Sequence, residues 1–320
     1  MQPRHLKRLL IGLVTLLIAL SSARLYYYLT DDFRLGNITY HIPFKAPWKS
    51  PVLSTQEHHQ LAHILDQTFY YHRKGSQYYI FISEDQQYIL KFFKFKHLRP
   101  HLLANFVPSV PPFRDFKQTN IENKKNKLLR VFDGFQLAYQ ENREGSGLVY
   151  LQLIPVPTLH QKVKIIDKLG IKRVINLDDV PFLIQFNGET LHTRLTRQLN
   201  KHQLQAAQQS LIAILGMYMT EYRKGIYDAD HGVMDNTGFI ADQPFRLDVA
   251  KLIRNTQMRH VNIYKKDLEH IIWKIDTWLK THYPQNRAQL SAVLAQEYQR
   301  LTGEKIDIAH LDPQNYIKKH

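Results

Sequence analysis

The sequence predicts an α+β fold in which a β-rich half precedes a helical half, behind an apolar N-terminal helix. Residues 75–186 hold short runs of aromatic and β-branched residues bounded by Gly, Pro or Asp, which is typical of strands. After Gly188 the apolar residues recur at helical spacing instead. A chain of 320 residues can bury a substantial core. We expect four segments: a membrane anchor or signal segment at 1–29, a linker and leading helix at 30–73, a β-rich part at 74–187 and a helical part at 188–320.

The N-terminal segment is apolar enough to enter a membrane. Basic residues precede an almost wholly apolar run from Leu9 to Leu20, and three tyrosines follow at 26–28. Residues 6–29 are long enough to cross a bilayer, and the tyrosines, which are typical of a membrane interface, favour a retained single-pass anchor. The small residues at 21–23 leave a cleaved signal peptide open. In both cases we expect a cytoplasmic N-terminus and an extracytoplasmic body.

A proline-containing linker leads into a short helix. Ser54 and Glu57 have the spacing of a capping box and predict the start of this helix. Its buried side is expected to hold Ile64, Leu65 and Phe69. The linker prolines are Pro43, Pro47 and Pro51.

The β-rich part is expected to begin with a hairpin. Its two strands are predicted at 78–83 and 88–95. Lys91 lies inside the second strand with large apolar neighbours on both faces, so a buried lysine there would require an anionic partner. A long helix at 115–141 follows, and then three strand-like runs at 148–154, 163–166 and 174–186.

The helical part is expected to contain three helices. Apolar stripes mark them at 204–222, 263–279 and 288–301. Glycine, which adopts the left-handed conformation that ends many helices, follows the first and third of them at Gly225 and Gly303.

The segment from Gly225 to Leu252 concentrates polar residues between the first two of these helices. Asp230, Asn236 and Asp248 are the ones we select as site candidates, whereas Asp228 is expected to be a turn or capping residue. A hairpin between Asn236 and Asp248 would return both side chains to the same end of its strands. The alternative is that these residues only form turns, in which Asp, Asn and Gly are common.

The order of these elements resembles the two-lobed fold of protein kinases and of their distant relatives, the aminoglycoside phosphotransferases. Gly75 and Ser76, followed by a strand, resemble a reduced Gly-rich loop that binds the nucleotide cofactor. Lys91, in Tyr-Ile-Leu-Lys, resembles the strand lysine that contacts phosphate and takes part in catalysis. The chain is also similar to membrane-associated proteins of chlamydia-like bacteria.

The resemblance implies phosphoryl transfer that depends on ATP and Mg²⁺. Asp230 would be the catalytic base, and Asn236 and Asp248 would hold the metal. The chain departs from the family pattern at several points: Asp230 and Asn236 lie six residues apart instead of five, Asp248 is followed by no glycine, and no helix glutamate to pair with the lysine is evident. Two alternatives therefore stay open. One is a catalytically inactive kinase-like binding or scaffold module at the bacterial envelope, and the other is an unrelated α+β envelope protein.

Composition narrows the remaining classes of function. The 43 Lys and Arg residues against 28 Asp and Glu make a net charge of +15, which favours acidic or phosphorylated partners besides the membrane contacted by residues 6–29. The sequence contains no nucleic-acid-binding motif and no Ser-centred nucleophile elbow. The absence of cysteine excludes disulfides, thiolate metal sites and a cysteine nucleophile. The 17 histidines show no metal-ligand spacing and are expected at the surface.

Overall fold

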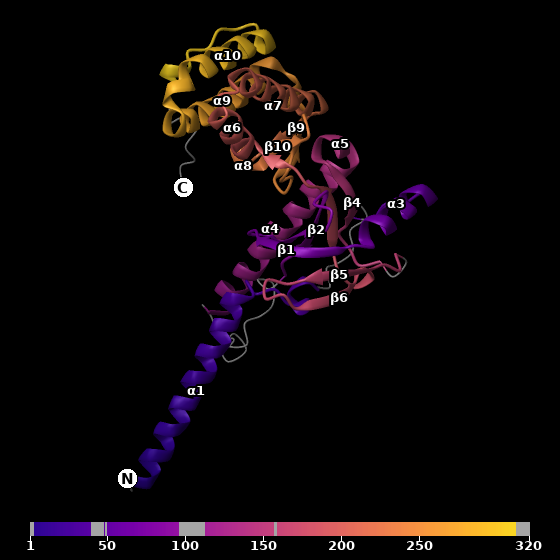
Figure 1. Ribbon diagram of the computed structural model, residues 1–320, viewed down its shortest axis with the longest axis vertical. Helices are drawn as coiled ribbons and strands as arrows, with labels where there is room; N and C mark the ends of the chain where they lie inside the picture. The colour runs from indigo at the N-terminus through magenta and orange to yellow at the C-terminus, as the bar shows by residue number, and fades with distance from the viewer. Residues whose placement is uncertain (1–2, 40–47, 49, 96–112, 157–158, 312–320) are drawn as a thin grey trace. The chain divides into compact units, whose positions relative to one another are not determined.

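The computed structural model describes residues 3–39, 48, 50–95, 113–156 and 159–311 (Figure 1). Pro43 and Pro47 of the predicted linker lie outside these ranges. The protein has a mixed α+β fold with a curled seven-stranded sheet and many helices. The chain divides into two compact units. Unit 1 comprises Met1–Lys45, Lys49–Ser109 and Gln152–Leu183, and unit 2 comprises Ala46–Trp48, Val110–Leu151 and Ile184–His320.

Unit 1 contains most of the seven-stranded sheet. The strand order is β4-β7-β3-β2-β1-β5-β6, and β1 runs parallel to β5, whereas the β1–β2, β2–β3 and β5–β6 pairs are antiparallel. Strands β4 and β7 cross the boundary between the units. The strands are β1 (Thr68–Lys74), β2 (Tyr78–Ser83), β3 (Tyr88–Phe93), β4 (Leu148–Gln152), β5 (Lys162–Ile166), β6 (Lys172–Asn176) and β7 (Phe182–Phe186).

The predicted hairpin and capped helix of unit 1 are confirmed, but two expectations are wrong. Helix α3 (Thr55–Leu65) starts at the predicted capping box. Phe69 is buried in β1 and not in that helix, because a run of β-formers begins at Thr68. The run at 174–186 is divided between β6 and β7 by the 3₁₀ turn Leu177–Asp179.

Helix α1 (Pro3–Leu29) contains the segment expected to enter a membrane. Its window Leu10–Leu29 has a mean hydropathy of 1.7 and no buried residues. By length and composition this helix is able to cross a membrane, although a signal sequence meets the same criteria. Helix α2 (Leu35–Ile38) follows it.

Unit 2 is mainly helical. Its core joins α7 (Leu204–Lys224), α9 (Val261–His282) and α10 (Pro284–Thr302), as the three apolar stripes predicted. Gly225 and Gly303 end α7 and α10 with φ of 72° and 79°. The third helix begins earlier than expected, because Pro284 is its first residue and proline is well tolerated there.

Unit 2 also contains two further helices and several short elements. The long predicted helix is α4 (Phe113–Glu141), whereas α6 (Leu191–Asn200) was not predicted. The short elements are α5 (Arg143–Ser146), β8 (Glu189–Thr190), β9 (Ile226–Asp228), α8 (Val233–Asn236), β10 (Thr237–Ile240), β11 (Gln243–Arg246) and β12 (Leu252–Arg254). The strands among these elements form a three-stranded sheet, in the order β11-β10-β8, and a two-stranded pair of β12 with β9.

Candidate functional site

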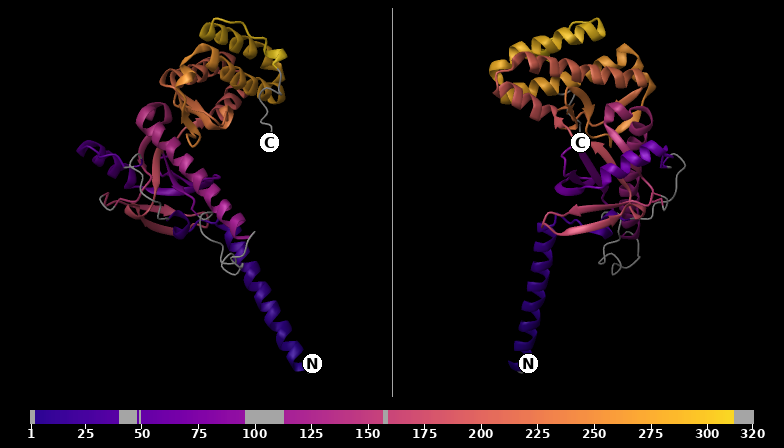
Figure 2. Two further views of the ribbon diagram at one scale, coloured as in Figure 1. Left: turned by 180° about the vertical axis from the view of Figure 1, so that it is seen from behind. Right: turned by 45° about the vertical axis from the view of Figure 1, so that its right-hand side comes forward.

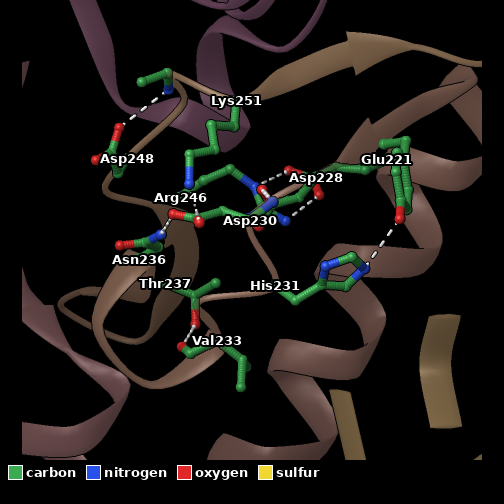
Figure 3. Close-up of polar contacts among 12 residues, drawn as sticks. Glu221, Asp228, Asp230, His231, Val233, Asn236, Thr237, Arg246, Asp248 and Lys251 are labelled. Atoms are coloured by element: carbon green, nitrogen blue, oxygen red, sulfur yellow. Dashed lines mark hydrogen bonds and ion pairs between the residues drawn. The ribbon is translucent and has the colours of Figure 1, made fainter. Parts of the chain in front are cut away.

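Three of the predicted site residues come together in unit 2 (Figure 3). The Asn236 side chain donates from Nδ2 to Asp230 Oδ2 at 2.8 Å. The main-chain oxygen of Asn236 accepts from the nitrogens of Leu247 at 2.8 Å and Asp248 at 3.3 Å. Asp230, Asn236 and Asp248 therefore lie in one small cluster of loops, which we call the Asp230 cluster.

The β10–β11 hairpin brings Asn236 beside Asp248. Its register pairs Thr237 with Arg246 and Ile240 with Gln243, so the residues just before β10 and just after β11 meet at the open end. This is the geometry that the sequence predicted for the hairpin.

The six-residue spacing between Asp230 and Asn236 is accommodated by the backbone of the loop. His231 has φ of 54°, in the left-handed region, and the helical turn α8 then begins at Val233. A Cβ atom added to Gly232 would lie 2.4 Å from Asn236 Nδ2, so the observed position of the amide requires glycine there.

Lys251 completes the Asp230 cluster and was missed by the sequence reasoning. Its Nζ forms an ion pair with Asp230 Oδ1. The pairing of β9 with β12, in which Leu252 faces Asp228, carries Lys251 to the Asp230 loop. The only signal in the sequence is a basic residue three positions after Asp248, and its partner is apparent only once these strands are paired.

Beside the Asp230 cluster lies a buried ionic group, which we call the Arg246 triad. Arg246 donates from Nε and Nη2 to the two carboxylate oxygens of Glu221, at 2.8 and 2.5 Å, and from Nη1 to Asp228 Oδ2 at 2.6 Å. The three side chains are at most 3% exposed. Burial opposes the charge on Arg246, but the two carboxylates outweigh it and hold the pKa of the guanidinium well above its usual value.

The triad corrects the interpretation of Asp228. Its Oδ1 does accept from the nitrogen of Asp230 at 2.9 Å, as a turn residue would. Its other oxygen, however, belongs to the ion pair with Arg246, so Asp228 links the buried charges to the backbone of the candidate base. Arg246 and Glu221 were not identified from the sequence.

The expectation that the histidines lie at the surface is wrong for His231, which is buried. Its Nε2 lies 2.6 Å from Asp267 Oδ1 and 3.1 Å from the Tyr227 hydroxyl. Asp267 also accepts from Tyr222 Oη at 2.5 Å, and burial together with Asp267 raises the pKa of Tyr222 well above its usual value. These bonds fix the residue that follows Asp230.

His231, Asp267 and His270 place potential metal-ligand atoms within 4.8 Å of one another, a spacing that the sequence reasoning overlooked. The rings of His231 and His270 stack at 4.3 Å between centroids. Because His231 Nε2 already bonds to Asp267 and Tyr227, we interpret this group as a support for the loop.

The predicted residues of unit 1 lie at the β1–β2 turn and in β3. Gly75 donates from its nitrogen to the Tyr78 oxygen at 2.9 Å and accepts from Lys94 Nζ, and Ser76 is the next residue of the turn. Lys91 is 4% exposed, and its Nζ lies 5.1 Å from the centroid of the Tyr78 ring, which favours a cation. The convergence of these residues with the Asp230 cluster stays a prediction.

Comparisons with known proteins give limited similarity. No protein-family model and no curated protein matches the sequence. The similar solved structures include two of WbdD. The first, described as a bifunctional kinase-methyltransferase, has a TM-score of 0.32 and 12% identity, covering 75% of this chain and 45% of that one. The second, WbdD with the kinase inhibitor LY294002, has a TM-score of 0.29 and 12% identity over 72% and 45%. The chain therefore spans less than half the length of that protein.

Proposed function

We propose that the protein is a membrane-anchored phosphotransferase with a two-lobed, protein-kinase-like architecture, which uses ATP and Mg²⁺. One observation carries this proposal: Asp230, Asn236 and Asp248, selected from the sequence for one chemistry, are joined by hydrogen bonds in the Asp230 cluster. A local turn accounts for the Asp248 carboxylate, which accepts from the Ala250 nitrogen at 3.0 Å, but not for the side-chain bond from Asn236 to Asp230.

The donor set suits a magnesium ion. Mg²⁺ prefers oxygen ligands, which the Asp248 carboxylate and the Asn236 amide oxygen supply. The amide nitrogen of Asn236 bonds to Asp230, so its planar amide directs the oxygen away from that carboxylate. A bound Mg²⁺ would neutralise charge on the phosphates.

The other side chains of the cluster have complementary roles in this proposal. Asp230 orients and deprotonates the acceptor hydroxyl, and Asn236 holds its carboxylate in place. Lys251 adds a positive charge beside the reacting groups, where negative charge develops. From the resemblance, Lys91 contacts phosphate, and Gly75 and Ser76 cover the nucleotide.

The membrane anchor in this proposal is α1, through residues 6–29, with the N-terminus in the cytoplasm and the body outside it. The basic composition suits an acidic or phosphorylated acceptor. Reporter fusions after Tyr28 and at the C-terminus test the orientation, and cytoplasmic activity of both reporters would contradict it.

Nucleotide-dependent stability tests the site. We expect the purified full chain to gain about 3 kcal/mol of stability when ATP with Mg²⁺ is present at about 100 times its Kd. Asp248→Ala and Lys91→Ala should each remove the gain. Asp235→Ala is the matched control, because Asp235 lies beside Asn236 but its side chain is 78% exposed, and it should keep the gain. The absence of any shift at millimolar nucleotide would refute the proposal.

The second candidate is a kinase-like binding module without catalysis. It is favoured by the contacts of Asp230, because Lys251 and Asn236 each engage one of the two oxygens that a base would offer to an acceptor. This candidate predicts stabilisation by ATP with Mg²⁺ but no release or transfer of phosphate. Lys251→Ala separates the two candidates. It should lower the rate of phosphate transfer by an active enzyme, whereas a binding module transfers no phosphate with or without Lys251.

A further inference from the structure

The β5–β6 hairpin of unit 1 has one face that is both basic and apolar. The register pairs Lys164 with Val174 and Ile166 with Lys172, so these four side chains lie on the same face of the hairpin. Lys164, Lys172 and Val174 are exposed, the last by 61%. The opposite face is buried in the core of unit 1 through Val163, Ile165 and Ile175.

Two further apolar side chains are exposed at the tip of the hairpin. Leu169 and Ile171 are each 43% exposed. Asp167, the sole acidic residue in the sequence from 162 to 176, is turned inward: it accepts from the nitrogens of Leu169 and Ile171 at 3.0 Å and forms an ion pair with Arg173 at 2.9 Å. The hairpin therefore offers positive charge and apolar side chains to the solvent, with its one carboxylate internally neutralised.

Ion pairs hold this tip at the end of α1. Lys168 Nζ lies 3.0 Å from Asp31 Oδ2, and Asp31 comes two residues after α1 ends. Lys74 binds the other oxygen at 3.1 Å, and the Tyr71 hydroxyl donates at 2.8 Å. Figures 1 and 2 show β5 and β6 lying crosswise at this end of the helix.

The same end of α1 has the features of a membrane interface. Tyr26 to Tyr28 are exposed there, and the Arg34 guanidinium lies 3.7 Å from the centroid of the Tyr27 ring and donates to its hydroxyl at 2.7 Å. Tyrosine is enriched where hydrocarbon meets headgroups, and arginine acts as an anchor there. A pocket of about 490 Å³ opens beside Asp31, and its walls include Lys74 and Lys168.

We propose, on the basis of the proposed membrane anchor α1, that the β5–β6 hairpin is a second membrane contact, which lies on the anionic surface of the same bilayer. Lys162, Lys164 and Lys172 would lie against anionic headgroups, with Val174 from the same face and Leu169 from the tip in the interface. Lysines on an edge strand such as β6 also discourage sheets from associating, but that role does not account for apolar side chains exposed beside them. Together the three lysines should favour docking by about a hundredfold.

The absence of cysteine makes a site-specific test direct. The full chain with Val174→Cys is labelled with an environment-sensitive dye and reconstituted into vesicles of phosphatidylcholine, with or without phosphatidylglycerol. We expect a blue shift of the emission, and quenching by a lipid-borne quencher, only with the anionic lipid. Raised salt should reverse both effects, because it screens exposed charges.

Charge reversal then identifies the surface. Lys162→Glu, Lys164→Glu and Lys172→Glu combined should abolish the response. The matched control reverses three exposed lysines of unit 2, Lys201, Lys280 and Lys305, and should retain it. Emission that is the same in both kinds of vesicle, or insensitive to salt, would overturn the proposal, as would an equal loss in the two triple variants. The salt and lipid comparisons use the unreversed chain, so they decide the question even if a triple variant fails to fold.

Discussion

The Arg246 triad and the Asp230 cluster lie side by side but differ in exposure (Figure 3). The side chain of Asp228 is 3% exposed and that of Asp230 is 33% exposed, although only one residue separates them. Asp228 ends β9 and faces a fully buried guanidinium, whereas Asp230 lies in the loop and meets a lysine that is 52% exposed. Two aspartates in one short motif therefore have different environments: Asp228 belongs to a buried ionic group, and Asp230 is partly exposed to solvent.

Removing the cation of the triad should have the largest effect. Arg246→Met leaves Glu221 and Asp228 buried without their counter-ion, so we expect a loss of about 3–5 kcal/mol in the free energy of unfolding. Denaturant titration of the full chain in detergent measures it. Arg223→Met on the exposed side of α7 is the control and should change stability by less than about 0.5 kcal/mol. Equal losses would mean that the triad adds no more stability than a surface arginine.

Replacing each aspartate in turn with asparagine tests whether Asp228 supports the fold and Asp230 the proposed reaction. Asp228→Asn should cost about 2–3 kcal/mol of stability, because it weakens a buried charged hydrogen bond. Asp230→Asn should cost less than about 1 kcal/mol, since its ion pair is partly exposed, and yet it should abolish phosphate transfer. Thermal unfolding and a phosphate-transfer assay on both variants measure these effects. A larger loss of stability in Asp230→Asn than in Asp228→Asn, with transfer lost only in Asp228→Asn, would contradict the prediction.

A single methyl group should disturb the Asp230 cluster alone. In Gly232→Ala the new Cβ meets Asn236 Nδ2, so we expect a loss of about 1–3 kcal/mol and a weaker response to ATP with Mg²⁺. Gly216→Ala in α7 is the matched control. Its Cβ would enter open space, and alanine is the better helix former, so stability should rise by up to about 1 kcal/mol. An unchanged nucleotide response in Gly232→Ala would separate Asn236 from the site.

The ion pairs of Asp31 extend the comparison to a carboxylate whose lysine partners are exposed, and they should have the smallest effect on stability. Burial opposes the charge on Asp31, but hydrogen bonds from Lys168, Tyr71 and Lys74 outweigh it and lower the pKa to about 2 from 3.8. This stabilisation is therefore complete above pH 3.8 and is lost as the pH falls towards 2. Because both lysines are more than 40% exposed, we expect about 1 kcal/mol. The difference between the wild type and Asp31→Asn should vanish over this pH range.

The sequence by itself determined the features that depend on near neighbours. Helix α7 with its glycine stop, the capping box of α3 and the β10–β11 hairpin beside Asn236 all follow from residues a few positions apart, where helical spacing, capping and turns act. The nearness of Asn236 and Asp248 was predictable for this reason. Strand β1 and helix α6 were missed although the sequence signals both: β-formers begin at Thr68, and Thr190 caps a helix whose leucines at 191, 195 and 199 are buried.

Only the tertiary structure decided which charged residues are buried and which meet. Arg246 reaches Glu221 across 25 positions of sequence, and Lys251 reaches Asp230 across 21. The type of a charged residue does not show whether its side chain is exposed or buried. Its burial is tolerated only where another element supplies a residue of opposite charge. Asp228 and Asp230 therefore look alike in the sequence and differ in the folded chain, because Asp228 lies in the β9–β12 pair and is buried, whereas Asp230 lies in the loop after it and is 33% exposed.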